Sequence, residues 1–258
     1  MALKFDGSND DVQVSLDLSS YTDTLNLAFW FKLVTMPTSG VDMVMEISPS
    51  ANAAGEFNIH LEGTADEIRF AFVAGGPSFN RHDFTKPTVG SWVHIGINVD
   101  LTTAAAADRM GIYYDGVKQT PITAGGASGS TTWDNDTLNI ASRNSANLRA
   151  DIEMQDLAFW SGVLDPLLFL EMTKGRSPLG CSPSTLIRYW PMYGTGDPER
   201  LGNAGLTIVG ATAVEGPLTT QPISAIYPST VVAAAVGAYM PQLQQSNLGA
   251  DLYNGTIQ

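Results

Sequence analysis

The sequence is poor in cysteine, in basic residues and in long apolar runs, and each shortage excludes a class of protein. A single cysteine, Cys181, excludes a disulfide framework and a thiolate zinc site. Lys and Arg together number 13, against 26 Asp and Glu in 258 residues, and the net charge of −13 argues against a nucleic-acid partner, which needs a basic face. The most apolar stretch, residues 231–240, is about half as long as a membrane-spanning helix. We therefore expect neither a nucleic-acid nor a membrane partner.

The N-terminus lacks the pattern of a secretion signal. Residues 1–11 are polar and acidic, without a basic region that leads into an apolar run. We therefore expect a protein without a signal peptide.

Charge is also scarce at the C-terminal end. From Leu201 to Gln258 the charged side chains are Glu215 and Asp251. A stretch with so few charges lacks what keeps a free tail solvated, so we expect this end to be buried against another surface. We predict a folded domain over residues 1–216 and an extended, low-charge arm over 217–258. The arm residues expected to make assembly contacts are Tyr227, Val231, Val232, Tyr239, Met240, Leu243 and Tyr253.

Alternation of apolar and polar residues recurs from Val12 to Val209 and is typical of half-buried strands. It predicts strands over residues 12–18, 25–33, 43–47, 57–61, 67–72, 92–99, 110–114, 138–142, 154–160, 186–190 and 206–209. Asp115-Gly116 predicts a tight hairpin turn, and Asp165 followed by Pro166 predicts the start of one short helix. Many short strands with few helices predict an all-β, two-sheet sandwich.

Six motifs, in this order, resemble the laminin-G-like family. They are F-D-G-S-N-D at 5–10, L-A-F-W-F-K at 27–32, S-W-V-H-I-G at 91–96, Y-Y-D-G-V at 113–117, L-N-I-A-S-R at 138–143 and L-A-F-W-S-G-V-L at 157–164. The resemblance implies a jelly-roll sandwich with the concanavalin A-like lectin/glucanase fold.

Two further strings resemble strands that usually precede the opening motif of this family. They are L-I-R-Y-W-P-M at 186–192 and L-T-I-V-G-A at 206–211, and here they follow it. Jelly-roll termini lie side by side, so either end of a chain can supply this strand pair. This order of elements is similar to that of laminin-G-like proteins predicted in bacteriophage genomes.

The phage-like arrangement implies a non-enzymatic structural protein of a tailed-phage virion, most specifically a capsid decoration protein. Its arm would clamp onto other copies of the chain or onto a major capsid protein, on the surface of a virion assembled in the host cytoplasm. Two alternatives stay open: a glycan-binding lectin or tail-fibre protein used in host attachment, and a glycoside hydrolase.

The hydrolase alternative depends on three acids. Asp151, Glu153 and Asp156 have the spacing of the E-x-D-x-x-E strand of laminarinase-like glycosidases, where a bulge brings the last acid onto the face of the first two. The shorter Asp side chains at both ends would fall short of a scissile bond. We therefore expect solvated or loop-facing acids and no catalytic residues.

A structural calcium ion is the one cofactor that the resemblance raises. Many relatives hold Ca²⁺ near the opening loop, where Asp6, Asn9, Asp10 and Asp11 offer oxygens. Gln155, however, stands where the family has an acid. An Asx-turn that uses Asp6 and Asn9 is the favoured role for this loop.

Glycan binding would need exposed aromatic rings beside amide or charged groups. Trp133 and the run Phe79, Asn80, Arg81 and His82 fall in expected loops, and they are the predicted glycan contacts. The histidines at 60, 82 and 94 are too scattered to predict a metal centre.

Overall fold

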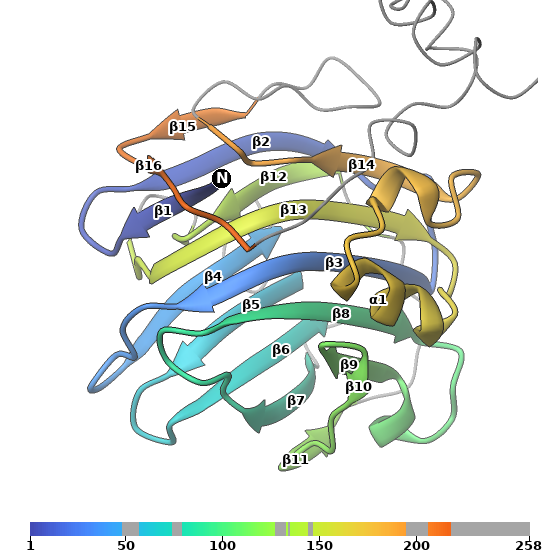
Figure 1. The fold of residues 1–258 in the computed structure, drawn as a ribbon. Coiled ribbons are helices and arrows are strands. Elements are labelled where there is room, and N and C mark those ends of the chain that lie inside the picture. Colours follow the sequence, from blue (N-terminus) through green and yellow to red (C-terminus); the bar gives the residue numbers. More distant parts are fainter. Residues whose placement is uncertain are drawn as a thin grey trace, which may run out of the picture.

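The computed structural model describes residues 1–47, 57–73, 79–126, 133, 135–143, 147–194 and 206–217, and these form two antiparallel sheets packed face to face (Figure 1). The front sheet contains β1 (Ala2–Asp6), β3 (Thr24–Leu33), β8 (Trp92–Asp100), β9 (Met110–Tyr114), β10 (Val117–Lys118), β13 (Asp151–Ser161), β14 (Leu186–Trp190) and β16 (Thr212–Val214). The back sheet contains β2 (Asp11–Asp17), β4 (Val41–Ile47), β5 (Phe57–Glu62), β6 (Glu67–Val73), β7 (Phe79–Thr85), β11 (Thr123–Gly125), β12 (Asn135–Ile140) and β15 (Thr207–Val209).

The strand order is β10-β9-β8-β3-β13-β1-β16 in the front sheet, where β14 also pairs with β13, and β11-β7-β6-β5-β4-β12-β2-β15 in the back sheet. Three short helices complete the described chain: η1 (Ala106–Asp108), α1 (Pro166–Thr173) and η2 (Pro178–Gly180). The all-β, two-sheet jelly-roll sandwich expected from the sequence is confirmed.

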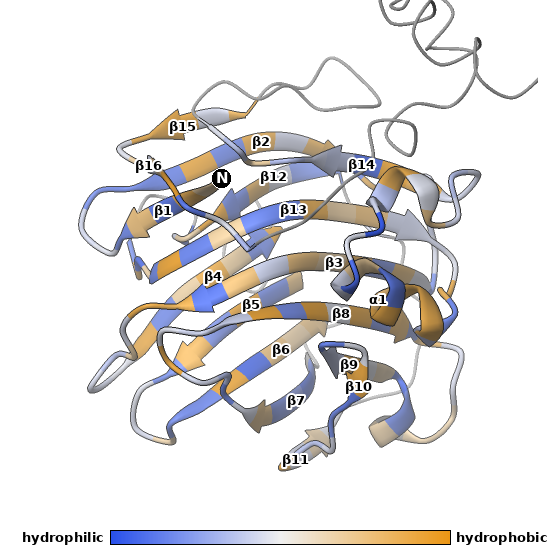
Figure 2. Ribbon diagram, in the orientation of Figure 1, coloured by the Kyte–Doolittle hydropathy of each residue, from blue (hydrophilic) through white to orange (hydrophobic). Residues whose placement is uncertain are grey.

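The core lies between the sheets and is built by alternation. In β5, Phe57, Ile59 and Leu61 are fully buried, whereas the intervening His60 and Glu62 point outward and are partly exposed. Figure 2 shows the same alternation of hydrophobic and hydrophilic residues along most strands. Each strand therefore gives one face to the core and one face to the outside.

The C-terminal strands complete both sheets beside the N-terminal ones. In the front sheet β16 pairs with β1, and in the back sheet β15 pairs with β2. β14 and β1 both pair with β13, along different stretches of its length. The structure thus confirms that the strands after the laminin-G-like motifs lie beside the opening strands, and it adds β16, which the alternation did not predict.

The predicted hairpin and helix both form. Asp115 and Gly116 have φ angles of 49° and 77° and join β9 to β10. Asp165 caps α1 by accepting a hydrogen bond from the backbone N–H of Leu167, and Pro166 is the first helical residue. Figure 1 shows α1 lying on the outer face of the front sheet.

The prediction that residues 79–82 form a loop is wrong, because Phe79–Thr85 is strand β7. Two of its inward positions are Asn80 and His82, which are fully buried opposite Phe72 and Phe70 of β6. Polar residues at core positions hide the alternation that reveals the other strands. The predicted arm contacts between Tyr227 and Tyr253 lie outside the described residues, and the domain boundary at 216 stays a prediction.

Candidate functional site

The outer face of the back sheet carries a pocket of about 480 Å³, which we call the arginine pocket. β4, β5 and β6 form its floor. The residues that line it are Val41, Met43, Asn58, His60, Glu62, Arg69, Ala71, Arg81, Arg143 and Leu148. Most of the lining residues on β5 and β6 occupy outward positions, so the pocket follows from the strand alternation.

A buried carboxylate holds two of the arginines. Asp83, whose side chain is 1% exposed, accepts hydrogen bonds from Arg69 Nε at 2.6 Å and from Arg81 Nη2 at 2.7 Å. Thr123 of the neighbouring strand also donates to this carboxylate. Burial alone would raise the pKa of Asp83, but the hydrogen bonds from Arg81, Thr123 and Arg69 outweigh it and lower the pKa to about 2. Asp83 is therefore ionised and keeps both guanidinium groups in place.

A neutral histidine lies beside this pair. Burial and the charge of Arg69 lower the pKa of His60 to about 4, although Glu62 opposes the shift. The Nδ1 atom lies 3.0 Å from the side-chain oxygen of Asn58, and the Nε2 atom lies 3.3 Å from Arg69 Nη1. Nε2 also lies 3.2 Å from Glu62 Oε1, and a neutral ring donates from one of its nitrogens and accepts at the other.

The third arginine is held in the same way from another strand. Arg143 Nε donates to Glu46 at 3.2 Å, and the side chain of Glu46 is fully buried. The arginine side chains are 16% exposed at Arg69, 49% at Arg81 and 29% at Arg143. Buried carboxylates therefore lie beneath and guanidinium groups lie above, nearer to solvent. Such an arrangement can donate several fixed hydrogen bonds to a ligand.

Of the predicted glycan contacts, Arg81 belongs to this pocket, whereas Asn80, His82 and Trp133 are buried elsewhere. Arg81 lines the pocket, whereas Asn80 and His82 point into the core. Trp133 is fully buried, with its ring centroid 6.3 Å from that of Phe72 and its backbone N–H donating to Tyr21. The expectation of an exposed Trp133 is therefore wrong. For Phe79 the structure describes the backbone alone.

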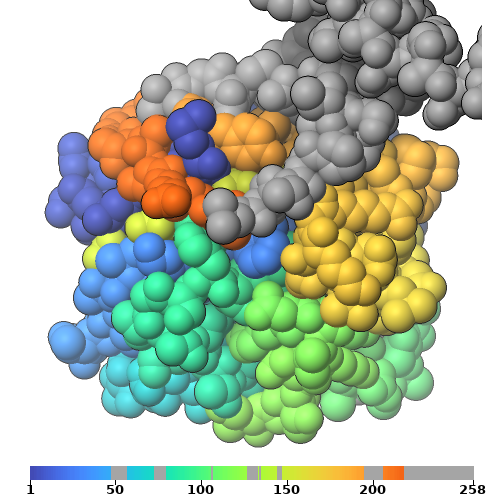
Figure 3. Space-filling view, in the orientation of Figure 1, coloured from blue at the N-terminus to red at the C-terminus, as the bar shows by residue number. Residues whose placement is uncertain are grey.

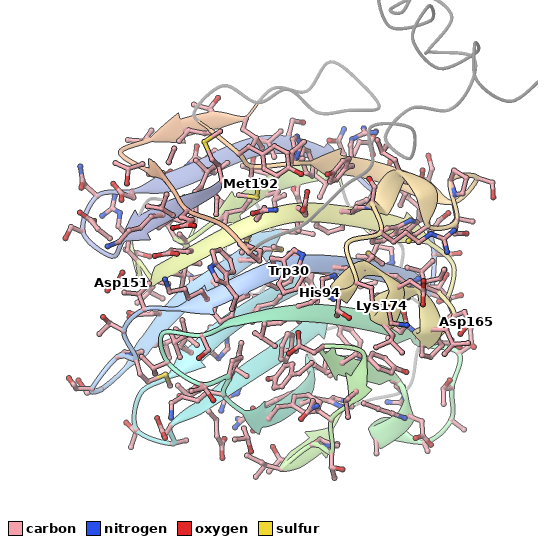
Figure 4. The ribbon with its side chains drawn as sticks, viewed as in Figure 1. Trp30, His94, Asp151, Asp165, Lys174 and Met192 are labelled. Carbon is pink, nitrogen blue, oxygen red and sulfur yellow. The ribbon has the colours of Figure 1, made fainter. Side chains whose placement is uncertain are left out.

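The three acids of the hydrolase alternative lie on the outer face of the front sheet. The register of β13 against β3 shifts between Gln155 and Ala158, and Asp156 has a φ angle of 55°, so a bulge is present at the expected position. Asp151 accepts a hydrogen bond from Thr35 at 2.6 Å, and Glu153 pairs with Lys32 at 3.1 Å. In Figure 4, Asp151 lies at the start of β13, away from Trp30 and His94.

Asp156 is 5% exposed and accepts hydrogen bonds from Tyr189 at 2.5 Å, Gln155 at 2.9 Å and Tyr193 at 3.1 Å. Burial raises the pKa of this carboxyl group. The expectation that these acids are solvated is wrong for Asp156, because the tyrosines cover it. The Asp156 carboxyl group thus connects β13 to Tyr189 and Tyr193 through hydrogen bonds.

The opening loop uses its acids to fold itself. Asp6 accepts a hydrogen bond from the backbone N–H of Ser8 at 2.9 Å, and Asp10 accepts one from the backbone N–H of Asp6 at 2.8 Å, while Asn9 is exposed. Ca²⁺ needs six to eight oxygens. Within the described ranges no group of three or more His, Cys, Asp or Glu is placed to hold a metal ion. The bond from Ser8 to Asp6 is that of an Asx-turn, and calcium binding by Asp6, Asn9 and Asp10 stays a prediction.

The single cysteine is buried. Burial raises the pKa of the Cys181 thiol to about 11, so it is not a nucleophile at neutral pH. In the part of the chain that the structure describes, no helix has both the length and the apolar character needed to cross a membrane.

Comparisons with known proteins agree with this architecture. A laminin-G-like family model, described as concanavalin A-like lectin/glucanases superfamily, matches residues 6–167. A candidate carbohydrate-binding protein from Bacteroides ovatus is similar in structure, with a TM-score of 0.56 and 14% identity over 86% of this chain. The chain spans 62% of the length of that protein.

A second similar structure is the binding domain of botulinum neurotoxin serotype G, with a TM-score of 0.46 and 13% identity over 67% of this chain and 46% of the toxin domain. No curated protein matches the chain in sequence. At these identities the structural likeness concerns the fold.

Proposed function

Because the chain belongs to the concanavalin A-like lectin/glucanases superfamily, we propose that it is a non-enzymatic glycan-binding protein whose ligand occupies the arginine pocket. The pocket itself carries the proposal. Its volume of about 480 Å³ lies within the range of roughly 300–1,000 Å³ that small-molecule sites occupy. Its polar groups are fixed in advance by ion pairs, which reduces the entropy lost when a ligand binds.

The absence of catalytic activity in this proposal follows from the acids. Glycoside hydrolysis needs two carboxyl groups on either side of the scissile bond. Glu62 is the one carboxylate among the described lining residues of the pocket, and it accepts a hydrogen bond from Arg69. On the front sheet, the tyrosines cover Asp156. The carbohydrate-related description of the Bacteroides ovatus protein, which shares the fold, is consistent with binding.

A glycan array probed with the labelled full-length protein, followed by calorimetry on the best ligands, tests the proposal. The variant Ala71→Phe fills the pocket without removing an ion pair, and we expect it to weaken binding at least ~10-fold, the loss of a hydrogen-bonded contact or more. Ala213→Phe places the same ring on exposed strand β16 and should bind like the wild type. Absence of binding to any glycan, or equal binding by both variants, contradicts the proposal.

The wider setting that we propose is the surface of a tailed-phage particle, with capsid decoration ahead of a tail-fibre role. Two observations support it: the strands β14 and β15 follow the laminin-G-like motifs in phage-like order, and residues 218–258 contain a single charged side chain, Asp251. In this setting the C-terminal segment contacts other copies or a major capsid protein.

The full-length variant Val231→Asp/Val232→Asp tests this setting by placing charge in the predicted arm. We expect it to lose self-association, or binding to purified phage capsids, while it keeps the melting temperature and the glycan binding of the wild type. Undiminished assembly by this variant would mean that the arm does not clamp.

A further inference from the structure

We infer that the ligand of the arginine pocket is an acidic saccharide, which places a carboxylate or a sulfate ester between Arg81 and Arg143. This inference rests on the proposed glycan-binding function and adds the chemical class of the sugar. It comes from three features of the pocket: which hydrogen-bond donors are in use, which acceptors are in use, and how the charges are layered.

The guanidinium groups keep donors available on their solvent side. Arg81 uses Nε and Nη2 on Asp83, and its Nη1 donates to no acceptor in the part of the chain that the structure describes. Arg143 uses Nε on Glu46, and its two Nη groups donate to no acceptor within the described residues. Each guanidinium carries five N–H donors, so most of the capacity of these two side chains faces the pocket.

The acceptors of the same cluster are occupied. Both oxygens of Asp83 accept hydrogen bonds, from Arg69, Arg81 and Thr123, and the side chain is 1% exposed. The side-chain oxygen of Asn58 lies 3.0 Å from His60 Nδ1, and Glu62, which also lines the pocket, accepts from Arg69. A neutral sugar offers hydroxyl groups that both donate and accept, whereas a carboxylate accepts only. The surplus of donors therefore favours a ligand that is rich in acceptors.

The layering of charge points the same way. Asp83 and Glu46 are buried beneath the pocket, while Arg81 and Arg143 are the most exposed of its charged groups. His60 is neutral at pH 7, so it adds no charge. A ligand therefore meets positive charge first, and a planar carboxylate can pair with a guanidinium through two parallel hydrogen bonds.

The net charge of −13 opposes long-range attraction of an anion. Affinity for the acid must then arise from direct contact, within the screening length of about 8 Å at physiological salt. Removing one guanidinium should consequently abolish the preference for the acid instead of reducing it slightly.

Calorimetry with the full-length protein on matched ligand pairs tests the inference. The pairs are oligogalacturonate and its methyl ester, sialyllactose and lactose, and chondroitin sulfate and its desulfated form. The first pair isolates a carboxylate, the second adds a whole sialic acid residue, and the third isolates a sulfate ester. In at least one pair we expect the member with the additional acid group to bind ~10-fold or more tightly, since hydrogen bonds to charged groups are the strong ones.

The variants Arg81→Gln and Arg143→Gln should bind both members of that pair about equally, and Arg176→Gln should keep the preference. Arg176 is a fair control because it is exposed and donates to the carbonyl of Gly180, in the loop after α1. Arg143→Gln leaves Glu46 without this partner and its melting temperature is checked first. If Arg143→Gln unfolds, the binding of Arg81→Gln alone tests the inference. This variant should stay folded, because the Arg81 side chain is 49% exposed and Asp83 still accepts a hydrogen bond from Arg69.

The outcomes separate the two levels of the proposal. Equal affinity within all three pairs, with binding lost in Ala71→Phe, would overturn the acidic ligand and leave a neutral-glycan pocket. A preference for acid that survives in Arg81→Gln would also overturn it. Failure to bind any saccharide would remove both the acidic ligand and the proposed function.

Discussion

The outer faces of the two sheets are built by the same alternation but serve different purposes. On the front sheet, many outward positions near α1 are small or apolar, and Ala28 and Ala158 join one buried cluster with Phe169 of the helix. On the back sheet, the outward positions of β5 and β6 include Asn58, His60 and Arg69, which line an open pocket. Figure 3 shows α1 and the segment after it covering one end of the front face. The chemistry of outward residues thus decides whether a sheet face is covered or available to a ligand.

The two faces also treat a histidine differently. His94 is 3% exposed, and Figure 4 places it beside Trp30, with ring centroids 5.3 Å apart. Burial alone lowers the pKa of His94 to about 3. For His60 burial is joined by the positive charge of Arg69. The pKa of His94 reflects packing, whereas that of His60 also responds to charge in the pocket.

The largest effect should come from the contact between α1 and the front sheet. A Cβ atom at Gly96 would overlap the buried ring of Phe169. We expect Gly96→Ala to lower the free energy of unfolding by about 3 kcal/mol, the upper end of typical overpacking costs, without changing glycan binding. Urea unfolding measures the loss.

The matched control for this substitution is Gly125→Ala. Gly125 lies in β11, and apart from its chain neighbours no heavy atom of the described residues lies within 4 Å of a Cβ placed there. Its free energy of unfolding should stay within about 0.5 kcal/mol of the wild type, as for other uncrowded positions. A small loss for Gly96→Ala would mean that α1 can move away from the sheet and that the front face is not closed.

A smaller effect should distinguish the back face by its response to acid. The pKa of His60 is about 4 in the folded protein, below the ordinary value of 6.5. Between these pH values His60 is protonated in the unfolded state and neutral in the folded state. The free energy of unfolding therefore decreases as the pH falls from about 6.5 to 4. At pH 5 this loss amounts to about 2 kcal/mol.

The variant His60→Gln removes this titration. Between pH 7 and pH 5 its free energy of unfolding should fall by about 2 kcal/mol less than that of the wild type, because His94 contributes equally to both. Urea unfolding at the two pH values gives the difference. Parallel pH profiles would show that His60 is not held neutral by the pocket.

The fold could be predicted from the sequence because its determinants are local. Alternation within one strand, the Asp115-Gly116 turn and the Asp165 cap each need a few neighbouring residues. The prediction failed at β7 because the determinant there is not local: Asn80 and His82 occupy core positions, and their burial depends on partners in β6 and not on their own hydropathy.

The site could not be predicted because its contacts join distant parts of the chain. Glu46 and Arg143 are 97 residues apart in sequence, and Arg69 meets Asp83 across two neighbouring strands. Trp133, surrounded in sequence by small and polar residues, is buried by its packing against Phe72. Alternation shows which residues face outward, but strand order decides which of them meet.

The last effect that we predict lies on the front face and has the opposite pH dependence to that of His60. Burial raises the pKa of Asp156 above 3.8, against the hydrogen bonds from Tyr189, Gln155 and Tyr193 and the charge of the N-terminal amino group, all of which lower it. The stability that this carboxyl group contributes is complete below pH 3.8 and is lost as the pH rises through the folded-state pKa. Asp156→Asn should therefore gain stability relative to the wild type as the pH rises from 4 to 7. Exposed Asp108→Asn serves as the control in the same urea titrations. If the wild type instead gained stability over this range, Asp156 would be held as a carboxylate, and the front face would contain a buried charge much as the back face does.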